Sequence, residues 1–150
     1  MKSETLVILI NTITMKNVFE NLGIISDNLL HLSPKETFEI CKMGAIIVDV
    51  REDFMIGYKK FAVPNVIYCP ASNISETFNI LFHNDYLIVA DSVGIHSKEV
   101  AKFLVNKGFV NIANMAGGLV EWERDGLPLQ VNLKEELSGQ CACQLKAKKK

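Results

Sequence analysis

The sequence contains no long hydrophobic run. A transmembrane helix needs ~20 consecutive apolar residues, and no segment of this chain approaches that length. The apolar run at residues 6–10 is shorter than the ~7–15 residues of a signal-peptide core, and Lys2 is followed closely by the acidic Glu4. We therefore expect a cytoplasmic protein that makes no contact with a membrane.

Positive charge is not in excess either. The 150 residues carry 16 basic and 17 acidic side chains, for a net charge of −1. Four basic residues cluster at the end of the chain, namely Lys146, Lys148, Lys149 and Lys150, so the rest has 12 basic and 17 acidic side chains, or −5. An acidic body argues against a nucleic-acid partner, which would require a basic patch. We interpret the terminal lysines as a solvated end or, alternatively, as a weak contact for an anionic partner.

Cysteine is scarce, with four residues: Cys41, Cys69, Cys141 and Cys143. Their spacing is not that of a disulfide framework, and a chain of 150 residues with 49% apolar content can fold as one domain without one. Cys41 lies among apolar neighbours in a predicted helix, and Cys69 ends a predicted strand. We therefore expect both thiols in or near the core.

The first helical pattern lies near the start of the chain. Apolar residues recur at Leu6, Leu9, Ile10 and Ile13, and Gly23 is a plausible stop. We interpret residues 1–28 as an N-terminal helical extension. Its apolar stripe would pack on the domain or on a second subunit, so a homodimer through this helix is one option.

Beyond this extension, predicted strands alternate with predicted helices. The strands are short apolar runs, typical of strands buried on both faces, at residues 29–32, 45–50, 66–68, 86–90 and 110–114. The helices are predicted at residues 34–43, 75–82, 97–107 and 118–124; Ser33 and Glu36 can form a capping box at the first of them. The alternation indicates a parallel sheet with helices on both faces, in which sites lie at the carboxyl ends of the strands.

The loop after the strand at residues 86–90 is the candidate site. It comprises Asp91, Ser92, Val93, Gly94, Ile95, His96 and Ser97. Gly94 permits a tight turn, and Ser97 can cap the following helix. The backbone N–H groups of such a turn point inward at the positive end of the helix dipole and form a small anion cradle. Phosphate, a thiolate-bound sulfur or a resident carboxylate could occupy it.

Three motifs, in this order, resemble the rhodanese family over about residues 32–130. They are Asp49-Val50-Arg51-Glu52, the loop Asp91 to Ser97, and Gly117-Gly118-Leu119-Val120-Glu121-Trp122 followed by Gly126-Leu127-Pro128. The resemblance implies a three-layer α/β fold for residues 29–130, with a parallel five-stranded sheet and helices on both faces, and leaves residues 131–150 as a polar tail. It also implies sulfur transfer, in which a loop cysteine carries sulfane sulfur as a persulfide and a cationic residue helps to bind the donor.

The chain departs from this family pattern at both chemical positions. Asp91 stands at the place of the cysteine and His96 at the place of the cation. A carboxylate cannot form a persulfide, so we interpret Asp91 as a permanent occupant of the cradle, held by charge-assisted bonds. A role as nucleophile in phosphoryl transfer is the weaker alternative, because the accompanying metal-binding constellation is not seen.

His96 has three interpretations: a surface residue at the helix start, a pH-sensitive partner for Asp91, or a metal ligand. A catalytic zinc site usually takes three protein ligands, and Asp91 and His96 supply two. We therefore expect no metal and no cofactor. Asp49 and Arg51 are interpreted as a buried ion pair that supports the loop, with contact to an anionic ligand as the alternative. Trp122 and the paired glycines are interpreted as packing and tight-turn residues.

Cys141 and Cys143 differ from the other two cysteines, because they lie in the polar tail near lysines, which lower a thiol pKa. Two hypotheses follow. The favoured one is a binding or regulatory module for an unknown protein or small-molecule partner, without orthodox thiosulfate sulfurtransferase activity. The alternative is a sulfur or redox carrier that uses Cys141 and Cys143, with the domain as scaffold.

Overall fold

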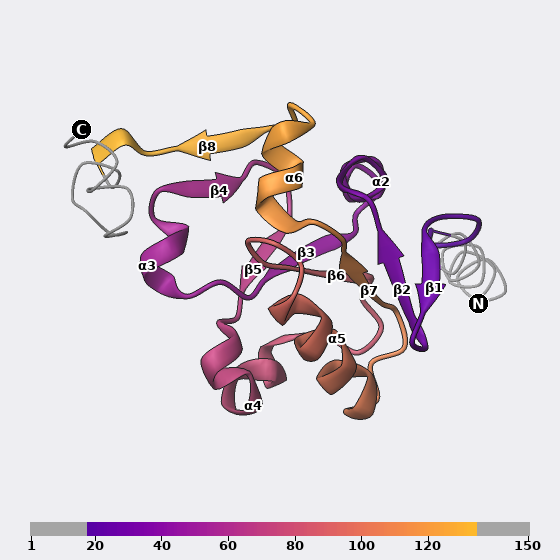
Figure 1. Cartoon of the computed structure of the whole chain (residues 1–150). Coiled ribbons are helices and arrows are strands. Elements are labelled where there is room, and N and C mark those ends of the chain that lie inside the picture. Colours follow the sequence, from indigo (N-terminus) through magenta and orange to yellow (C-terminus); the bar gives the residue numbers. More distant parts are fainter. Residues whose placement is uncertain (1–17, 135–150) are drawn as a thin grey trace, which may run out of the picture.

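The computed structural model describes residues 18–134 as a layered α/β domain (Figure 1). The main sheet has the strand order β1-β2-β7-β6-β3-β5. Its strands are β1 (Ile24–Ser26), β2 (Leu29–Leu32), β3 (Ile46–Asp49), β5 (Val66–Tyr68), β6 (Leu87–Ala90) and β7 (Ile112–Met115). The helices are α2 (Pro34–Cys41), α3 (Asp53–Ile56), η1 (Ala71–Asn73), α4 (Ile74–Thr77), η2 (Phe78–Ile80), α5 (His96–Asn106) and α6 (Gly118–Arg124).

Five of the six strands are parallel, as the sequence predicted: β2, β7, β6, β3 and β5 pair in register along one direction. Successive side chains of the central strands enter opposite cores because a strand has a period of two. Ile47 and Ile88 belong to the core under α2 and α6, whereas Val48 and Val89 belong to the core under α4 and α5. Figure 1 shows the two helical layers on either side of the sheet. The α/β class with helices on both faces is confirmed.

The described part of the predicted N-terminal extension is not helical. Residues 18–21 form a turn, and β1 then pairs antiparallel with β2 at the edge of the sheet. Asp27 and Asn28 join the two strands with φ angles of 55° and 58°, the left-handed pair that a two-residue hairpin turn requires. The helical prediction was wrong here because apolar residues pack on the domain from a turn and not from a helix. The ring of Phe19, for example, meets the ring of Tyr86 edge-on at 4.9 Å. The rest of the predicted helix lies outside the described residues.

A second, two-stranded sheet lies beside the main one. Here β4 (Lys59–Phe61) pairs antiparallel with β8 (Leu129–Val131). Neither strand was predicted from the sequence, because each is only three residues long and because β8 runs into the expected polar tail at Val131. Trp122 anchors this region, since its fully buried ring packs edge-on against Phe38 and Phe61 and its Nε1 donates to the carbonyl oxygen of Pro128 at 2.9 Å.

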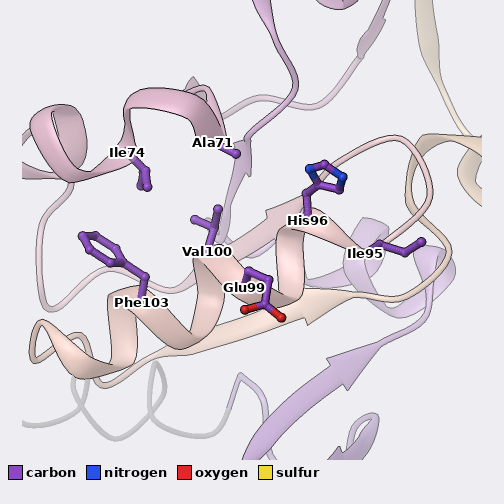
Figure 2. A pocket seen from close by; sticks show the side chains of 7 residues that line it. All are labelled: Ala71, Ile74, Ile95, His96, Glu99, Val100 and Phe103. Carbon is purple, nitrogen blue, oxygen red and sulfur yellow. The ribbon is translucent and has the colours of Figure 1, made fainter.

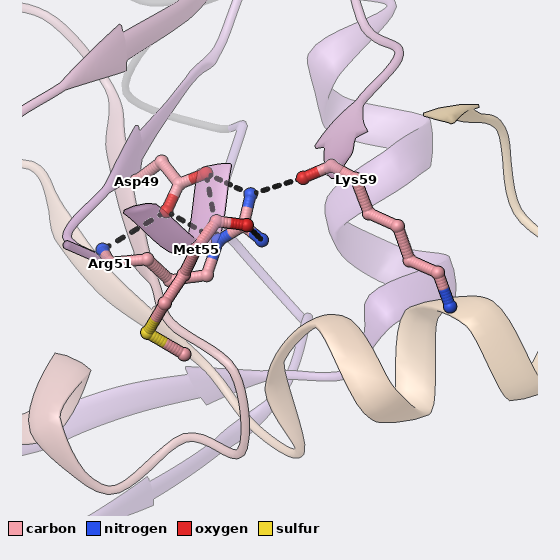
Figure 3. A network of polar contacts seen from close by, with 4 residues as sticks. All are labelled: Asp49, Arg51, Met55 and Lys59. Atoms are coloured by element: carbon pink, nitrogen blue, oxygen red, sulfur yellow. Dashed lines mark hydrogen bonds and ion pairs between the residues drawn. The ribbon is translucent and has the colours of Figure 1, made fainter. Parts of the chain in front are cut away.

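A buried ion pair ends strand β3 (Figure 3). The side chains of Asp49 and Arg51 are 0% and 2% exposed. Arg51 Nη2 lies 2.8 Å from Asp49 Oδ2, and Arg51 Nε lies 3.0 Å from Asp49 Oδ1. The same guanidinium donates to the carbonyl oxygens of Met55 at 3.3 Å and Lys59 at 2.8 Å. One side chain therefore joins the end of β3 to α3 and β4, which confirms the predicted ion pair.

Replacing Arg51 should be far more costly than replacing an exposed cation. Arg51→Ala leaves the Asp49 carboxylate buried without its partner, which lowers the free energy of unfolding by about 3–5 kcal/mol. The matched control is Lys42→Ala, because Lys42 forms an exposed pair with Glu39 that is worth about 1 kcal/mol or less. Urea unfolding of the two variants measures the difference. Equal losses would contradict a structural role for the buried pair.

Candidate active loop

The candidate loop lies between β6 and α5, and the Asp91 carboxylate occupies its interior. Asp91 is 5% exposed. Its Oδ1 accepts the N–H of Gly94, and its Oδ2 accepts those of His96 at 2.8 Å and Ser97 at 3.2 Å. These contacts confirm the prediction that the carboxylate accepts backbone bonds from within the loop. They also place its negative charge at the N-terminus of α5, where the helix dipole favours it.

Ser97 does not cap α5, contrary to the sequence prediction. The helix begins at His96, and its preceding residue makes no side-chain capping bond. The side chain that receives the first N–H groups of the helix is that of Asp91, five and six residues earlier. Ser97 is instead fully buried in the first turn, where its hydroxyl donates to Asn114 Oδ1.

The start of α6 holds the first two residues of the loop. The N–H of Leu119 donates to the carbonyl oxygen of Asp91 at 2.9 Å, and that of Val120 donates to Ser92 at 3.0 Å. A Cβ atom at Gly118 would lie 2.6 Å from the Asp91 carbonyl oxygen, so only glycine allows this approach. The glycine pair that the sequence analysis assigned to tight turns therefore also packs directly against the loop.

Three residues that the sequence analysis did not single out continue the polar network. Asn114 Nδ2 lies 3.1 Å from His31 Nδ1, and His31 Nε2 lies 3.2 Å from the carbonyl oxygen of Ser26. Asn114 is fully buried although it sits in a strand of apolar residues. An asparagine within an apolar strand was the signal in the sequence that could have revealed this network, because a buried amide needs hydrogen-bond partners.

The outer surface of the loop is apolar. Val93 is 50% exposed and Ile95 is 64% exposed. Beside them lies a groove of about 320 Å³, lined by Ala71, Ile74, Ile95, His96, Glu99, Val100 and Phe103. Figure 2 shows the groove between α5 and the segment of η1 and α4, with the ring of His96 at its rim. His96 contacts the Asp91 carboxylate through its backbone N–H, and its exposed ring faces the groove.

Asp49 and Arg51 lie one strand away from the loop. Asp49 pairs in register with Ala90, the residue before Asp91. The Arg51 guanidinium is directed at Asp49, Met55 and Lys59. The structure thus brings the ion pair beside the base of the loop, with its donors committed to protein acceptors.

The two cysteines in the described part of the chain are buried. Cys41 and Cys69 are 1% and 0% exposed, as the sequence predicted. Burial raises the pKa of the Cys41 thiol to about 12. Burial also raises the pKa of Cys69, against a smaller opposing effect of a hydrogen bond with Thr77. Both thiols are therefore protonated at neutral pH. Cys141 and Cys143 lie outside the described residues.

Within residues 18–134, no three His, Cys, Asp or Glu side chains are grouped so that they could hold a metal ion. In the same part of the chain, each helix is too short or too polar to cross a membrane.

Known proteins share this loop-bearing fold. The family model of the rhodanese-like domain matches residues 33–125. A thiosulfate sulfurtransferase of Haemophilus influenzae, GlpE, is 28% identical over 102 residues, which cover 65% of this chain and 91% of that protein. Rhodanese-like domain-containing protein 17 of Arabidopsis thaliana is 33% identical over 104 residues, which cover 61% of this chain and 67% of that protein.

Among solved structures, a rhodanese-related protein from Thermoplasma volcanium superposes with a TM-score of 0.61 at 27% identity. The match covers 68% of this chain and 98% of that one. The matching family model spans the strands from β3 to β7, the loop and helix α6. The chain therefore belongs to the rhodanese-like domain family.

Proposed function

We propose that this rhodanese-like domain is a binding or regulatory module without orthodox thiosulfate sulfurtransferase activity. In this proposal, Asp91 stands where the sulfur-carrying members of the family have their loop cysteine. The observation that carries the proposal is the position of the Asp91 carboxylate, which accepts the N–H groups of Gly94, His96 and Ser97 inside the loop.

The chemistry of a carboxylate excludes the persulfide route. Sulfur transfer through this loop requires a thiolate that attacks a sulfane sulfur and forms an S–S bond, and a carboxylate oxygen cannot replace that sulfur. The three N–H groups that would stabilise a bound anion are already bonded to Asp91. An anionic donor such as thiosulfate would also meet the like charge of the carboxylate, which is unfavourable at short range.

A binding role fits the outer surface of the same loop. Bonds from the carboxylate and from the N–H groups at the start of α6 hold the loop from two sides, so the apolar side chains of Val93 and Ile95 are presented on a fixed backbone. A contact surface that is ordered before binding loses less conformational entropy when a partner docks. The partner in this proposal is a protein or small molecule; a homodimer through the N-terminal extension belongs to the same proposal.

A second candidate function is sulfur or redox carriage by the tail. It is favoured by the burial of Cys41 and Cys69, because any accessible thiol chemistry of this chain then falls to Cys141 and Cys143. The domain would act as a scaffold for these two residues. This candidate differs from the first in a measurable way, since it requires sulfur to be found on the tail.

We expect no thiosulfate:cyanide transfer by the wild-type protein above the buffer blank, because Asp91 cannot hold sulfane sulfur. Asp91→Cys supplies the thiol, and Asp91→Cys/His96→Arg adds the cation of the family pattern. Both variants are expected to show measurable turnover, and the second to show more. Wild-type turnover that survives Cys141→Ala/Cys143→Ala would contradict the proposal. Wild-type turnover that disappears in this double variant would instead support the carrier candidate.

Thiol labelling tests which cysteines are available. Brief alkylation of the native protein should modify Cys141 and Cys143 before Cys41 and Cys69, because burial keeps the latter two protonated and covered. Mass spectrometry of the peptides measures the order, and alkylation in denaturant is the control for equal labelling. Early labelling of Cys41 or Cys69 would be the opposite result. Treatment with a sulfane donor then decides the carrier candidate, which fails if no extra sulfur is found on the Cys141–Cys143 peptide.

A further inference from the structure

A chain of four polar contacts runs from the sheet edge to the loop. It begins at the Ser26 carbonyl oxygen on β1 and passes through His31 on β2. It continues through Asn114 on β7 to the hydroxyl of Ser97 on α5. It ends at Asp91 Oδ1, which lies 3.5 Å from Ser97 Oγ. Asn114 and Ser97 are fully buried, whereas His31 at the start of the chain is half-buried.

Both ends of this series of contacts are hydrogen-bond acceptors, and this fixes the direction of each hydrogen bond between them. The Ser26 carbonyl can only accept, so the proton of a neutral His31 ring belongs on Nε2. His31 Nδ1 is then an acceptor for Asn114 Nδ2. The amide oxygen of Asn114 consequently receives the Ser97 hydroxyl proton. The last contact, between Ser97 Oγ and Asp91 Oδ1, is left without a proton, and it is the longest of the four at 3.5 Å.

A proton added to His31 would allow each of the four contacts to form a hydrogen bond. Both ring nitrogens of a protonated histidine are donors, so Nδ1 then requires an acceptor. The Asn114 amide can supply its oxygen by rotating half a turn about its terminal bond, which leaves its volume unchanged. Its nitrogen then donates to Ser97 Oγ, and the Ser97 hydroxyl turns to donate to Asp91. All four contacts carry a proton in this arrangement.

We propose that His31 is a proton-sensitive switch that acts on the loop through Asn114 and Ser97. Protonation at the sheet edge adds a fourth hydrogen-bond donor to the Asp91 carboxylate and tightens the loop that the proposed function assigns to binding. Histidine is the side chain that ordinarily changes charge between about pH 5 and pH 8. The switch concerns regulation of the loop and rests on the proposed function only for its biological meaning.

The charged groups around His31 keep their charge over this pH range. Asp27, in the turn between β1 and β2, forms an ion pair with Lys102 of α5. The hydrogen bond with Lys102 lowers the pKa of Asp27 and raises that of Lys102. Lys98, also on α5, adds a further positive charge near Asp27. At the Asp91 end of the contacts, the exposed ring of His96 is a second imidazole beside the loop, so the test removes it.

Nuclear magnetic resonance on the full-length chain tests the switch. His96→Gln is the starting background, so that the loop carries no imidazole of its own. We expect the backbone amide signals of Gly94 and Ser97 to shift between about pH 5 and pH 8 with the same midpoint as the His31 ring. Adding His31→Gln should abolish this shift. Adding His83→Gln is the matched control, because His83 stacks on Phe109 outside the chain of contacts, and the shift should persist.

Ser97→Ala, in the same background, tests whether the effect of His31 reaches the loop through the Ser97 hydroxyl. It removes the hydroxyl and keeps the backbone N–H, so the His31 ring should still titrate while the Gly94 amide no longer follows it. Flat Gly94 and Ser97 signals beside a titrating His31 ring would overturn the proposal. A shift that persists after His31→Gln would do so as well. These results are independent of the sulfur-transfer assay, so failure of the proposed function and failure of the switch are distinguishable.

Discussion

The loop depends on the bonds between the Asp91 carboxylate and the N–H groups at the start of α5. They satisfy backbone donors that would otherwise be unpaired at a buried helix end, and they place a fixed negative charge inside an anion cradle. The carboxylate of Asp91 itself lies in this cradle. These N–H groups are thus bonded to a side chain of the protein itself, which is the physical basis of the proposed binding role.

Much of the fold could be predicted from the sequence, because the strands at residues 46–49 and 87–90 are buried on both faces and read as continuous apolar runs. The capping box of Ser33 and Glu36 likewise located the start of α2. The short strands β1, β4 and β8 could not be predicted, since each has only three residues. The side chains of β1 are exposed, and β4 and β8 form only by pairing with each other across a long stretch of sequence. The Asp27-Asn28 turn was missed because neither residue is glycine, although both adopt left-handed angles.

The contacts within the loop could be predicted from the sequence. Asp91 and the loop donors are within six residues of one another, so the turn chemistry was sufficient to expect their contacts. The chain of contacts through Asn114 and His31 was not, because it joins residues 83 positions apart and exists only once β2 and β7 are paired. The predicted cap at Ser97 was wrong for two reasons. The Asp91 carboxylate takes the capping role within the loop, and Asn114 of β7 receives the Ser97 hydroxyl.

Amide hydrogen exchange in the loop tests the central claim most directly. The N–H groups of Gly94, His96 and Ser97 should be protected in the wild-type protein and lose their protection in Asp91→Ala. Val93 and Ile95, in the same loop, have exposed side chains and no backbone bond to the carboxylate among the described contacts, so their amides should exchange equally fast in both proteins. Fast exchange of Gly94, His96 and Ser97 in the wild type would show that the carboxylate does not occupy the loop.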